Sequence, residues 1–578
     1  MDKNNTDKEF SLLYPSESAR PVGINRWGEN TVDDLGIEQL AWDLSIENQY
    51  HDAIKLILLE LCGDINTITY RQEILDDLLK NPVVFTGLRE LLPVFAKLKG
   101  YAEARAQKTA LQEVLSRLPE LNTYITSLRK LQKILVDAGD DTRSRGLGRL
   151  RILLAEVTAD PTFLSLENGL PELLAIMKTV PSITIGINLD SELMPVEATL
   201  LAIHDKPFRE NTLFDRLLGK TSGQMPTFGI GPMHEVPYTR VAGIDGRIVK
   251  IPNRSDPLLV PLFKDLYDIL RTVLAPVAGE LKQYAQVNAR LLIQLEAELA
   301  FYLGAVALTQ RMQAGGLPVC RPQADPIGAR AGHIQGMYNL ILAMSQLNSG
   351  DKSTNHAIVL NDVDFGPAGR VFILTGPNQG GKTIYTQAIG LAQVLFQAGL
   401  HVPAEAARMS PVDGIYTHFA TLEKTDSGMG RLGEEAKRLN EIFHSITDKS
   451  LVLLNESLSS TSPGESLYLA RDIVHALRLF GVRAIFATHL HELAEGVDSI
   501  NAEVKGDSLV VSLVAGVALE DGKEDVIDDI VPRTYKIKPG PPRGMSYARG
   551  IAVRYGISFE QLTEHWREQQ GGGNNNRA

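Results

Sequence analysis

The sequence predicts a mixed fold, in which a largely α-helical region is followed by an α/β domain near the C-terminal end. Two observations indicate this. Apolar residues recur at spacings of three and four through much of residues 37–318, as they do on one face of a helix. Beyond residue 319, short apolar runs typical of buried strands alternate with helical patterns, and one run leads into a glycine-rich loop.

The length and composition set limits on the architecture. A chain of 578 residues is too long for one hydrophobic core, because single cores stop growing at roughly 250 to 300 residues, so we expect two to four domains. The hydrophobic fraction of 44% and the charged fraction of 22% are ordinary for a globular protein. The formal net charge of -12 argues against a nucleic-acid binder that is basic overall, and leaves a local basic patch open.

The sequence also bears on the compartment. The first ten residues are polar and have no apolar core, so they do not form a secretory signal. No run approaches the roughly 18 apolar residues that span a bilayer. Cys62 and Cys320 match no zinc or redox spacing, and nothing indicates a disulfide framework. We therefore expect a cytoplasmic protein without a membrane partner.

The helical region begins after a polar, turn-rich segment, residues 1–36, for which we expect a loosely ordered arm. Asn81-Pro82 predicts a break between helices, because the residue before a proline is pushed out of the helical conformation. Pro119 should kink or split a later helix. The candidate core positions on either side of the break are Leu56, Leu59, Ile74, Leu78, Leu111, Val114, Leu118, Leu121, Ile125, Leu128, Leu131 and Leu135.

A small mixed insert interrupts the helical region at about residues 182–253. It begins with a strand pattern over residues 182–189, in which apolar and small or polar residues alternate. Helical stripes return with Leu262, Leu266, Ile269 and Val273, and again with Leu292, Leu295, Leu299 and Tyr302. Gly315-Gly316 and Pro318 end this region. The α/β domain is then expected at residues 319–565, and a flexible tail at residues 566–578.

The strongest motif lies between an apolar strand pattern at residues 371–374 and an amphipathic helix pattern at residues 384–397. It fits G-x-x-x-x-G-K-[ST] and consists of Gly376, Pro377, Asn378, Gln379, Gly380, Gly381, Lys382 and Thr383. Glycines let backbone N–H groups curl around phosphates, and the start of the helix adds its positive dipole end. We expect this loop to bind ATP, with Lys382 at the β- and γ-phosphates and the Thr383 hydroxyl on Mg²⁺.

A second motif should complete the metal site. The apolar run Leu451–Leu454 is followed by Asn455 and Glu456, where P-loop enzymes place a carboxylate that holds Mg²⁺. Glu456 is the candidate for orienting or deprotonating the attacking water, and Asn455 stands where aspartate is expected. Either Asn455 still offers a neutral oxygen and hydrolysis is slower, or ATP is bound and hardly turned over. Retention of Glu456 favours the first reading.

A third strand pattern, Ala484–Ala487, ends in Thr488 and His489. A histidine after a strand is usually structural. Here it follows the other two motifs in the chain order of a P-loop ATPase, so we assign His489 to the site as a sensor of the γ-phosphate. His491 is expected to be a bystander.

These residues resemble the MutS mismatch-repair family, a branch of the ABC-type ATPases. The resemblance covers roughly residues 320–565. It rests on Thr375-Gly376-Pro377-Asn378 with Gly-Gly-Lys-Thr, Val402-Pro403-Ala404, Leu451–Glu456 with Thr461-Ser462, Phe486–His489 with Glu492-Leu493, and Tyr535-Lys536-Ile537 with Pro539-Gly540 and Ser546-Tyr547-Ala548. Upstream, residues 71–92 resemble the start of the family's helical core and lever region. Nothing resembles the family's N-terminal mismatch-reading domain.

The resemblance implies a homodimer in which a serine-bearing loop of one subunit completes the ATP site of the other. The matching loop is residues 426–431, and Ser427 is the candidate, although Met429, Gly430 and Leu432 depart from the family's serine- and threonine-rich pattern.

The resemblance also implies that the levers embrace DNA, more readily branched or distorted DNA than base mismatches. The candidate phosphate contacts are Arg143, Arg145, Arg149 and Arg151, for which a solvated charged face is an equal explanation. An ATP-gated module that recruits a protein or nucleic-acid partner with little or no hydrolysis is the alternative function.

Overall fold

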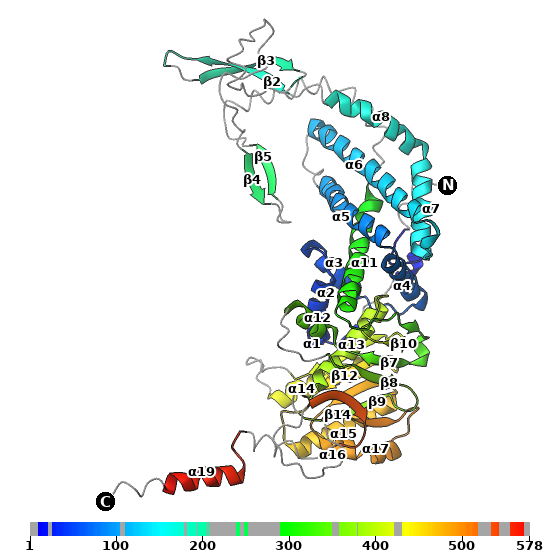
Figure 1. Cartoon of the computed structure of the whole chain (residues 1–578), viewed down its shortest axis with the longest axis vertical. Helices are drawn as coiled ribbons and strands as arrows, with labels where there is room; N and C mark the ends of the chain where they lie inside the picture. The colour runs from blue at the N-terminus through cyan, green and yellow to red at the C-terminus, as the bar shows by residue number, and fades with distance from the viewer. Residues whose placement is uncertain are drawn as a thin grey trace, which may run out of the picture. The chain divides into compact units, whose positions relative to one another are not determined.

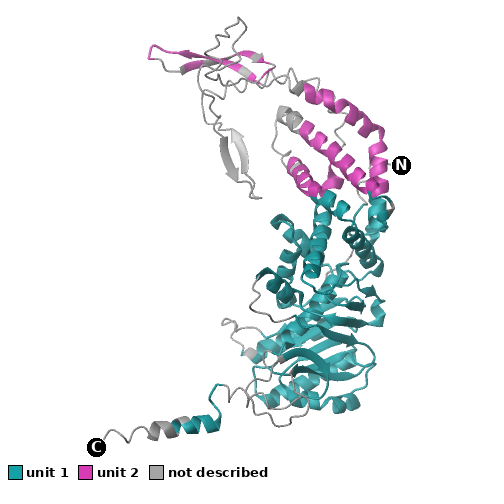
Figure 2. Cartoon of the chain, in the orientation of Figure 1, with its two compact units in different colours: residues 1–89, 138–150, 294–578 teal, residues 90–137, 151–293 magenta. Residues whose placement is uncertain are grey.

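The structure is a computed structural model, and its described residues form two compact units (Figure 2). One unit comprises residues 1–89, 138–150 and 294–578, and the other residues 90–137 and 151–293. The residues that the structure describes are 10–20, 26–103, 110–177, 182–192, 195–204, 206, 238–242, 248–252, 289–349, 358–377, 380–420, 430–517, 533–542 and 555–571.

The first unit is built on a seven-stranded sheet with the strand order β1-β11-β12-β13-β9-β14-β15. Strands β9, β12 and β14 of this sheet are labelled in Figure 1. Neighbouring strands run parallel except for the antiparallel pair β14 and β15. The strands are β1 (Arg26–Trp27), β9 (Val371–Thr375), β11 (Gly414–Phe419), β12 (Leu451–Asn455), β13 (Arg483–Ala487), β14 (Val510–Val517) and β15 (Arg533–Pro539). Every residue of β9, β11, β12 and β13 is buried, which explains why β9, β12 and β13 are largely apolar runs instead of alternating patterns.

Helices cover this sheet, and a second sheet lies in the same unit. The helices that follow its strands are α13 (Lys382–Gln397), α14 (Arg431–Ser445), α15 (Pro463–Phe480), α16 (His491–Glu495) and α17 (Val497–Glu503). Apolar side chains of α14 and α15 pack with those of β12 and β13 in one core. The second sheet has the order β6-β10-β7-β8, with β6 (Gln323–Ala324), β7 (Gly332–Met337), β8 (Asn361–Phe365) and β10 (Ala406–Met409), and α12 (Leu340–Ser349) follows β7.

The helical part of the first unit contains short helices and one long buried one. It includes α1 (Thr31–Leu35), α2 (Ile37–Leu44), α3 (His51–Leu58), α4 (Ile65–Lys80) and most of α11 (Arg290–Ala314), and α19 (Phe559–Gly571) belongs to the same unit. Helix α11 is long and apolar enough to cross a membrane, but 78% of its apolar window is buried within the structure. A core helix has these properties, and α11 is packed as one.

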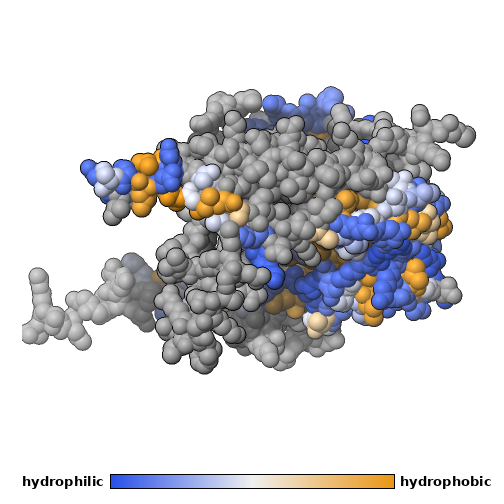
Figure 3. All heavy atoms as spheres, turned by 90° about the horizontal axis from the view of Figure 1, so that it is seen from above, coloured by the Kyte–Doolittle hydropathy of each residue, from blue (hydrophilic) through white to orange (hydrophobic). Residues whose placement is uncertain are grey.

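The second unit contains α6 (Ala110–Asp137), α8 (Pro161–Met177) and most of α5 (Pro82–Glu103) and α7 (Arg145–Ala159). Arg129 on α6 forms two bonds of 2.7 and 2.6 Å to the carboxylate of Glu167 on α8. Two hairpins follow, β2 (Ser182–Leu189) with β3 (Pro195–His204), and β4 (Tyr238–Ala242) with β5 (Ile248–Pro252). Figure 3 shows the molecule from above, and the described residues on this face are a mixture of hydrophobic and hydrophilic ones.

Several predicted elements are confirmed. Helix α4 ends at Lys80 and α5 begins at Pro82, so the predicted break lies at Asn81. Strand β2 spans residues 182–189, and the stripe from Leu292 to Tyr302 is buried on α11. Outside the described residues lie the stripe Leu262, Leu266, Ile269 and Val273 and the tail beyond residue 571. The helix that precedes this tail extends to Gly571, further than the sequence suggested.

Two local predictions are settled by the structure, one in part. Of the kink or split expected at Pro119, the split does not occur: α6 continues through this residue, because the buried side chains on both sides of it, Leu118 and Leu121, outweigh the one backbone hydrogen bond that proline removes. Leu56 was a candidate core position and is 70% exposed. The buried residues of α3 are His51, Ile54, Ile57 and Leu58, and Leu56 lies on the other side of the helix.

The described part of residues 1–36 is more ordered than the polar composition suggested. Phe10, Leu12 and Leu13 are buried. The backbone oxygens of residues 11, 12 and 13 accept hydrogen bonds from Tyr70, Tyr302 and Arg71. Further along, β1 joins the edge of the seven-stranded sheet. Hydrogen bonds to the backbone of residues 11–13 and the pairing of β1 hold this segment, so it needs few apolar side chains to be ordered.

Candidate functional site

The candidate site lies at one edge of the seven-stranded sheet, where three neighbouring strands end. Strands β12, β13 and β9 are adjacent and parallel, with Asn455 opposite Ala487 and Ala487 opposite Leu374. Because the carboxyl ends of parallel strands meet at one edge, the segments that follow them are brought together there. These segments are the glycine-rich loop after β9, Asn455–Glu456 at the end of β12, and Thr488–His489 after β13.

The glycine-rich loop needs glycine at its two ends. Gly376 has φ 141° and Gly381 has φ 90°, which are conformations that favour glycine. A Cβ atom at Gly376 would lie 2.6 Å from the Cβ atom of Ala515. Gly381 is the residue before α13, so the loop leads directly into the N-terminus of that helix. Pro377 and Gly380 complete the described part of the loop, and Asn378 and Gln379 lie outside the described residues.

Lys382 is the first residue of α13 and its side chain turns back over the loop. Its Nζ atom donates to the backbone oxygens of Gly376 at 3.0 Å and of Pro377 at 3.1 Å. Burial lowers the pKa of this ammonium, and the nearby Glu456 carboxylate opposes that shift. The side chain is therefore a partly desolvated cation inside the loop, where a phosphate would compete well for its hydrogen bonds.

Thr383 and Asn455 bring two oxygen atoms together. The Thr383 hydroxyl donates to Oδ1 of Asn455 at 3.3 Å, and Asn455 is buried while Thr383 is exposed. Mg²⁺ prefers oxygen ligands and usually keeps several waters together with phosphate oxygens. The Thr383 hydroxyl and the Asn455 amide oxygen are two such oxygen ligands, and both are neutral. The residues present therefore fit Mg²⁺, with one negative charge fewer than an aspartate at residue 455 would supply.

Glu456 and His489 form a direct pair. Nε2 of His489 and Oε1 of Glu456 are 2.8 Å apart, and their side chains are 42% and 35% exposed. Glu456 has φ 54°, a strained conformation for a residue other than glycine, and its N–H donates to the backbone oxygen of Ala487 at 2.8 Å. The carboxylate is thus held toward solvent at the strand end, with a histidine beside it. His491 begins α16, and burial lowers its pKa.

The residue after Glu456 is fixed by a buried histidine of the neighbouring strand. Nδ1 of His418 on β11 lies 2.8 Å from the hydroxyl oxygen of Ser457. Burial, with a smaller contribution from the charge of Arg438, lowers the pKa of His418 to about 4. The imidazole is therefore neutral at neutral pH and serves as a hydrogen-bonding anchor for the turn that carries Glu456.

A cavity of about 410 Å³ opens beside the loop. Gly381, Lys382, Thr383 and Glu456 line one side of it. The remaining wall is largely apolar and includes Met337, Leu342, Ile358, Val359, Ala388 and Tyr535. A cavity of this size, with a mainly apolar wall and a few polar groups, is typical of a small-molecule site.

Tyr535 is a site residue that sequence reasoning missed. It has φ 53°, and a Cβ atom at Gly381 would lie 3.4 Å from Cδ1 of its ring. Asn361 holds this backbone by donating to the Tyr535 oxygen at 3.0 Å and accepting from the Ile537 N–H at 2.8 Å. In the sequence it stood only within the family resemblance at Tyr535-Lys536-Ile537, with no role at the site, because β15 follows β9 only after a long stretch of chain.

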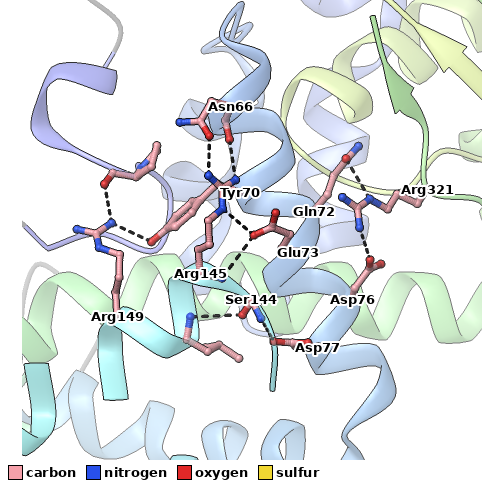
Figure 4. A network of polar contacts seen from close by, with 12 residues as sticks. Asn66, Tyr70, Gln72, Glu73, Asp76, Asp77, Ser144, Arg145, Arg149 and Arg321 are labelled. Carbon is pink, nitrogen blue, oxygen red and sulfur yellow. Dashed lines mark hydrogen bonds and ion pairs between the residues drawn. The ribbon is translucent and has the colours of Figure 1, made fainter. Parts of the chain in front are cut away.

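Two of the four arginines that were considered for DNA, Arg145 and Arg149, are engaged within the chain (Figure 4). Arg145 bonds to Glu73 at 3.0 Å and to the side-chain oxygen of Asn66 at 2.6 Å. Arg149 donates to the backbone oxygen of Pro15 at 2.7 Å and to the hydroxyl of Tyr70 at 3.3 Å. These contacts fix the start of α7 on α4 and favour the structural explanation for both arginines. Arg143 is exposed, and Arg151 is half-buried.

Two family models match this chain. The model described as MutS2 N-terminal domain matches residues 63–315, and the one described as MutS domain V matches residues 372–538.

This chain belongs to the MutS family.

Curated proteins support the assignment. Similar ones include the DNA mismatch repair protein MutS of Symbiobacterium thermophilum, 33% identical over 248 residues, which are 42% of this chain and 26% of that protein. The MutS of Lactobacillus helveticus is 27% identical over 318 residues, 55% of this chain and 32% of that protein. The MutS of Chlorobium limicola is 37% identical over 161 residues, 26% of this chain and 18% of that protein. The chain thus spans less than a third of the length of these relatives.

The two MutS matches cover different parts of the chain. The domain V match runs from β9 into β15, so it contains Lys382, Thr383, Asn455, Glu456 and His489. The N-terminal-domain match runs from just before α4 to the end of α11. Residues 10–62, which include β1 and α1, lie outside both MutS matches.

Proposed function

We propose that this MutS-family protein binds ATP with Mg²⁺ at the edge of the seven-stranded sheet and hydrolyses it slowly. The observation that carries the proposal is that one cavity is lined by Lys382, Thr383 and Glu456, three side chains from two strand ends of the sheet. The glycine loop and the N-terminus of α13 suit the phosphates, and the apolar wall with Tyr535 suits the base. In this arrangement the loop acts as a P-loop of the ABC type.

The roles of the side chains follow from their positions. Lys382 exchanges its two hydrogen bonds to loop carbonyls for bonds to the β- and γ-phosphates. The negative phosphates then neutralise the positive charge of this buried ammonium. Glu456 orients a water molecule for attack on the γ-phosphorus and accepts its proton, and the bond to the ADP oxygen breaks. His489, bonded to Glu456, holds the carboxylate in place and contacts the γ-phosphate. Mg²⁺ held near Thr383 and Asn455 would neutralise charge on the phosphates.

The same proposal includes a homodimer that acts on DNA in the cytoplasm. It is supported by the family assignment and by relatives named as DNA mismatch repair proteins. Ser427, which lies outside the described residues, is the candidate contact to the partner's nucleotide. Branched or distorted DNA is the expected substrate. With Arg145 and Arg149 engaged within the chain, DNA contacts are expected from other residues of the helical region.

A second candidate function follows from Asn455. If the metal is held too weakly for turnover, ATP binding alone changes the dimer, and the chain is an ATP-gated module that recruits a partner. The steady-state rate of ATP hydrolysis, with and without DNA, separates the two candidates. Bound nucleotide without turnover under both conditions supports the second.

The first test is nucleotide binding by a Lys382→Ala variant. Affinity for a fluorescent ATP analogue should fall by at least about a hundredfold, because a charge-assisted contact to two phosphates is lost. Lys437→Ala is the matched control, since Lys437 is 66% exposed on α14. Equal affinity of the two folded variants would refute the P-loop assignment.

The second test is a panel of duplex, mismatched, forked and four-way DNA, with and without ATP. We expect tighter binding to the forked and four-way DNA and a dependence on nucleotide. Binding should weaken as salt rises, as phosphate contacts require. Equal, nucleotide-independent binding to all four would contradict the DNA part of the proposal and leave the ATP part intact.

A further inference from the structure

Helix α1, which lies outside both family matches, is attached to the helix that carries the phosphate-binding lysine. The side chain of Gln387, one turn after Thr383 on α13, donates to the backbone oxygen of Asp34 at 3.1 Å. Leu35 packs against Gly390 so closely that a Cβ atom there would lie 2.5 Å from its Cδ2 atom. Together with the pairing of β1 and β11, these contacts place residues 26–36 along α13 and the sheet edge (Figure 1).

The Asp34 side chain is bonded to the end of β11. Thr417 donates its hydroxyl to Oδ2 of Asp34 at 2.5 Å and its N–H to Oγ1 of Thr31 at 3.1 Å. The backbone N–H of Phe419 also bonds to the Asp34 carboxyl, and the charge of Arg438 on α14 stabilises it. The carboxylate is therefore bonded to the end of β11 and is influenced by the charge of Arg438 on α14. Burial raises the pKa of Asp34, and these groups oppose the shift.

The end of β11 is in turn the support for Asn455. Phe419 and Asn455 are register partners in the parallel pair, and the N–H of Ala420 donates to the backbone oxygen of Asn455 at 3.2 Å. Register partners in a parallel sheet point to the same face, so Thr417, Phe419 and Asn455 share the face covered by α13. A change of the Asp34 side chain should therefore act first on Asn455 and on Glu456 after it, because its hydrogen bonds go to Thr417 and Phe419 of β11.

We propose that Asp34 is a positioning residue of the nucleotide site: it fixes the end of β11 and thereby aligns Asn455 and Glu456 with the loop and with Mg²⁺. This inference rests on the proposed function. Residues 26–36 then support the nucleotide site, although they are more than 340 residues away from Lys382 in the sequence. Removing the carboxylate leaves the buried N–H of Phe419 without this acceptor and leaves the Thr417 hydroxyl with only the Thr31 hydroxyl at 3.2 Å, which loosens the strand end.

The inference makes a distinct kinetic prediction. Asp34→Ala should lower kcat about tenfold, as the loss of one charge-assisted hydrogen bond implies, with KM for ATP changed less than about twofold. It should also raise the Mg²⁺ concentration for half-maximal binding of a fluorescent ATP analogue, a readout independent of hydrolysis. Asp34→Asn retains an acceptor for Thr417 and should lie between Asp34→Ala and the wild type. Asp33→Asn is the matched control, because Asp33 is the exposed neighbour on the same helix.

A second variant separates positioning from loss of folding. Thr417→Val removes the donor and keeps the volume, and combined with Asp34→Ala it should lower kcat no further than either change alone. Additive losses of kcat, or a kcat and Mg²⁺ dependence of Asp34→Ala equal to those of Asp33→Asn, would overturn the role of Asp34 while nucleotide binding stands. Absence of ATP binding in the wild type would overturn the proposed function, and the inference with it.

Discussion

Asn455→Asp tests how much the neutral amide at the metal site weakens Mg²⁺ binding compared with a carboxylate. A magnesium ion about 2.1 Å from the Thr383 hydroxyl would lie within about 5 Å of the side-chain oxygen of residue 455, because the two oxygens are 3.3 Å apart. Charges of +2 and -1 at about 5 Å attract by about 7 kcal/mol for an effective dielectric constant of about 20. Asn455 is 5% exposed, so burying a carboxylate there costs several kcal/mol.

The attraction of the carboxylate to Mg²⁺ and the cost of burying it largely cancel. A remainder of about 1.4 kcal/mol corresponds to a tenfold lower Mg²⁺ concentration at half-maximal turnover. The assay is the rate of ATP hydrolysis against Mg²⁺ concentration, with a sizing experiment in ATP to follow the dimer. Asn440→Asp is the control, because it adds the same charge on the exposed side of α14. If both variants keep the wild-type Mg²⁺ dependence, Asn455 is not beside the metal and the reasoning fails.

Further outcomes are expected from neighbouring residues. Glu456→Gln should retain ATP binding and lose at least about a hundredfold in turnover, and single-turnover hydrolysis at the wild-type rate would exclude Glu456 as the base. Tyr535→Ala should weaken binding of a fluorescent ATP analogue about threefold to tenfold through lost stacking, with no effect if the base lies elsewhere. Because burial lowers the pKa of Lys382 below its ordinary 10.5, ATP affinity should fall as pH rises through the alkaline range, and in Lys382→Arg it should stay level. Arg71 is fully buried and bonded to Glu60 at 2.8 Å, so Arg71→Met should lower the free energy of unfolding by about 3 kcal/mol. Denaturant melts measure this loss, and Glu60→Gln added to Arg71→Met should restore part of it.

The sequence was sufficient for the parts of the site that follow from local pattern. An apolar run that is buried on both faces reads as a strand, so β9, β12 and β13 were predictable, and their parallel order brings Lys382, Asn455 and His489 to one edge. The break at Asn81 was predictable for the same reason, since the restriction imposed by Pro82 is local.

The rest could not be predicted because it depends on contacts between distant segments. Leu12 and Leu13 look like isolated apolar residues in a polar stretch, but they are buried, and Tyr302 of α11 and Arg71 of α4 bond to their backbone oxygens. Arg145 and Arg149 look the same in sequence whether they meet phosphates or Glu73 and Tyr70. Tyr535 lies on β15, which pairs with β14, and it lines the cavity. The sequence pattern does not reveal which strand β15 pairs with.

The pairing of β1 with β11 has a consequence for how the α/β region can be isolated. A fragment that starts near residue 319 would lack β1 and α1, which leaves the hydrogen-bonding edge of β11 unpaired and uncovers the part of α13 around Gly390. Unpaired edges of this kind promote association between chains. During synthesis, residues 26–27 emerge long before residues 414–415 exist, so this edge closes late, and pairing between such distant segments is expected to slow folding.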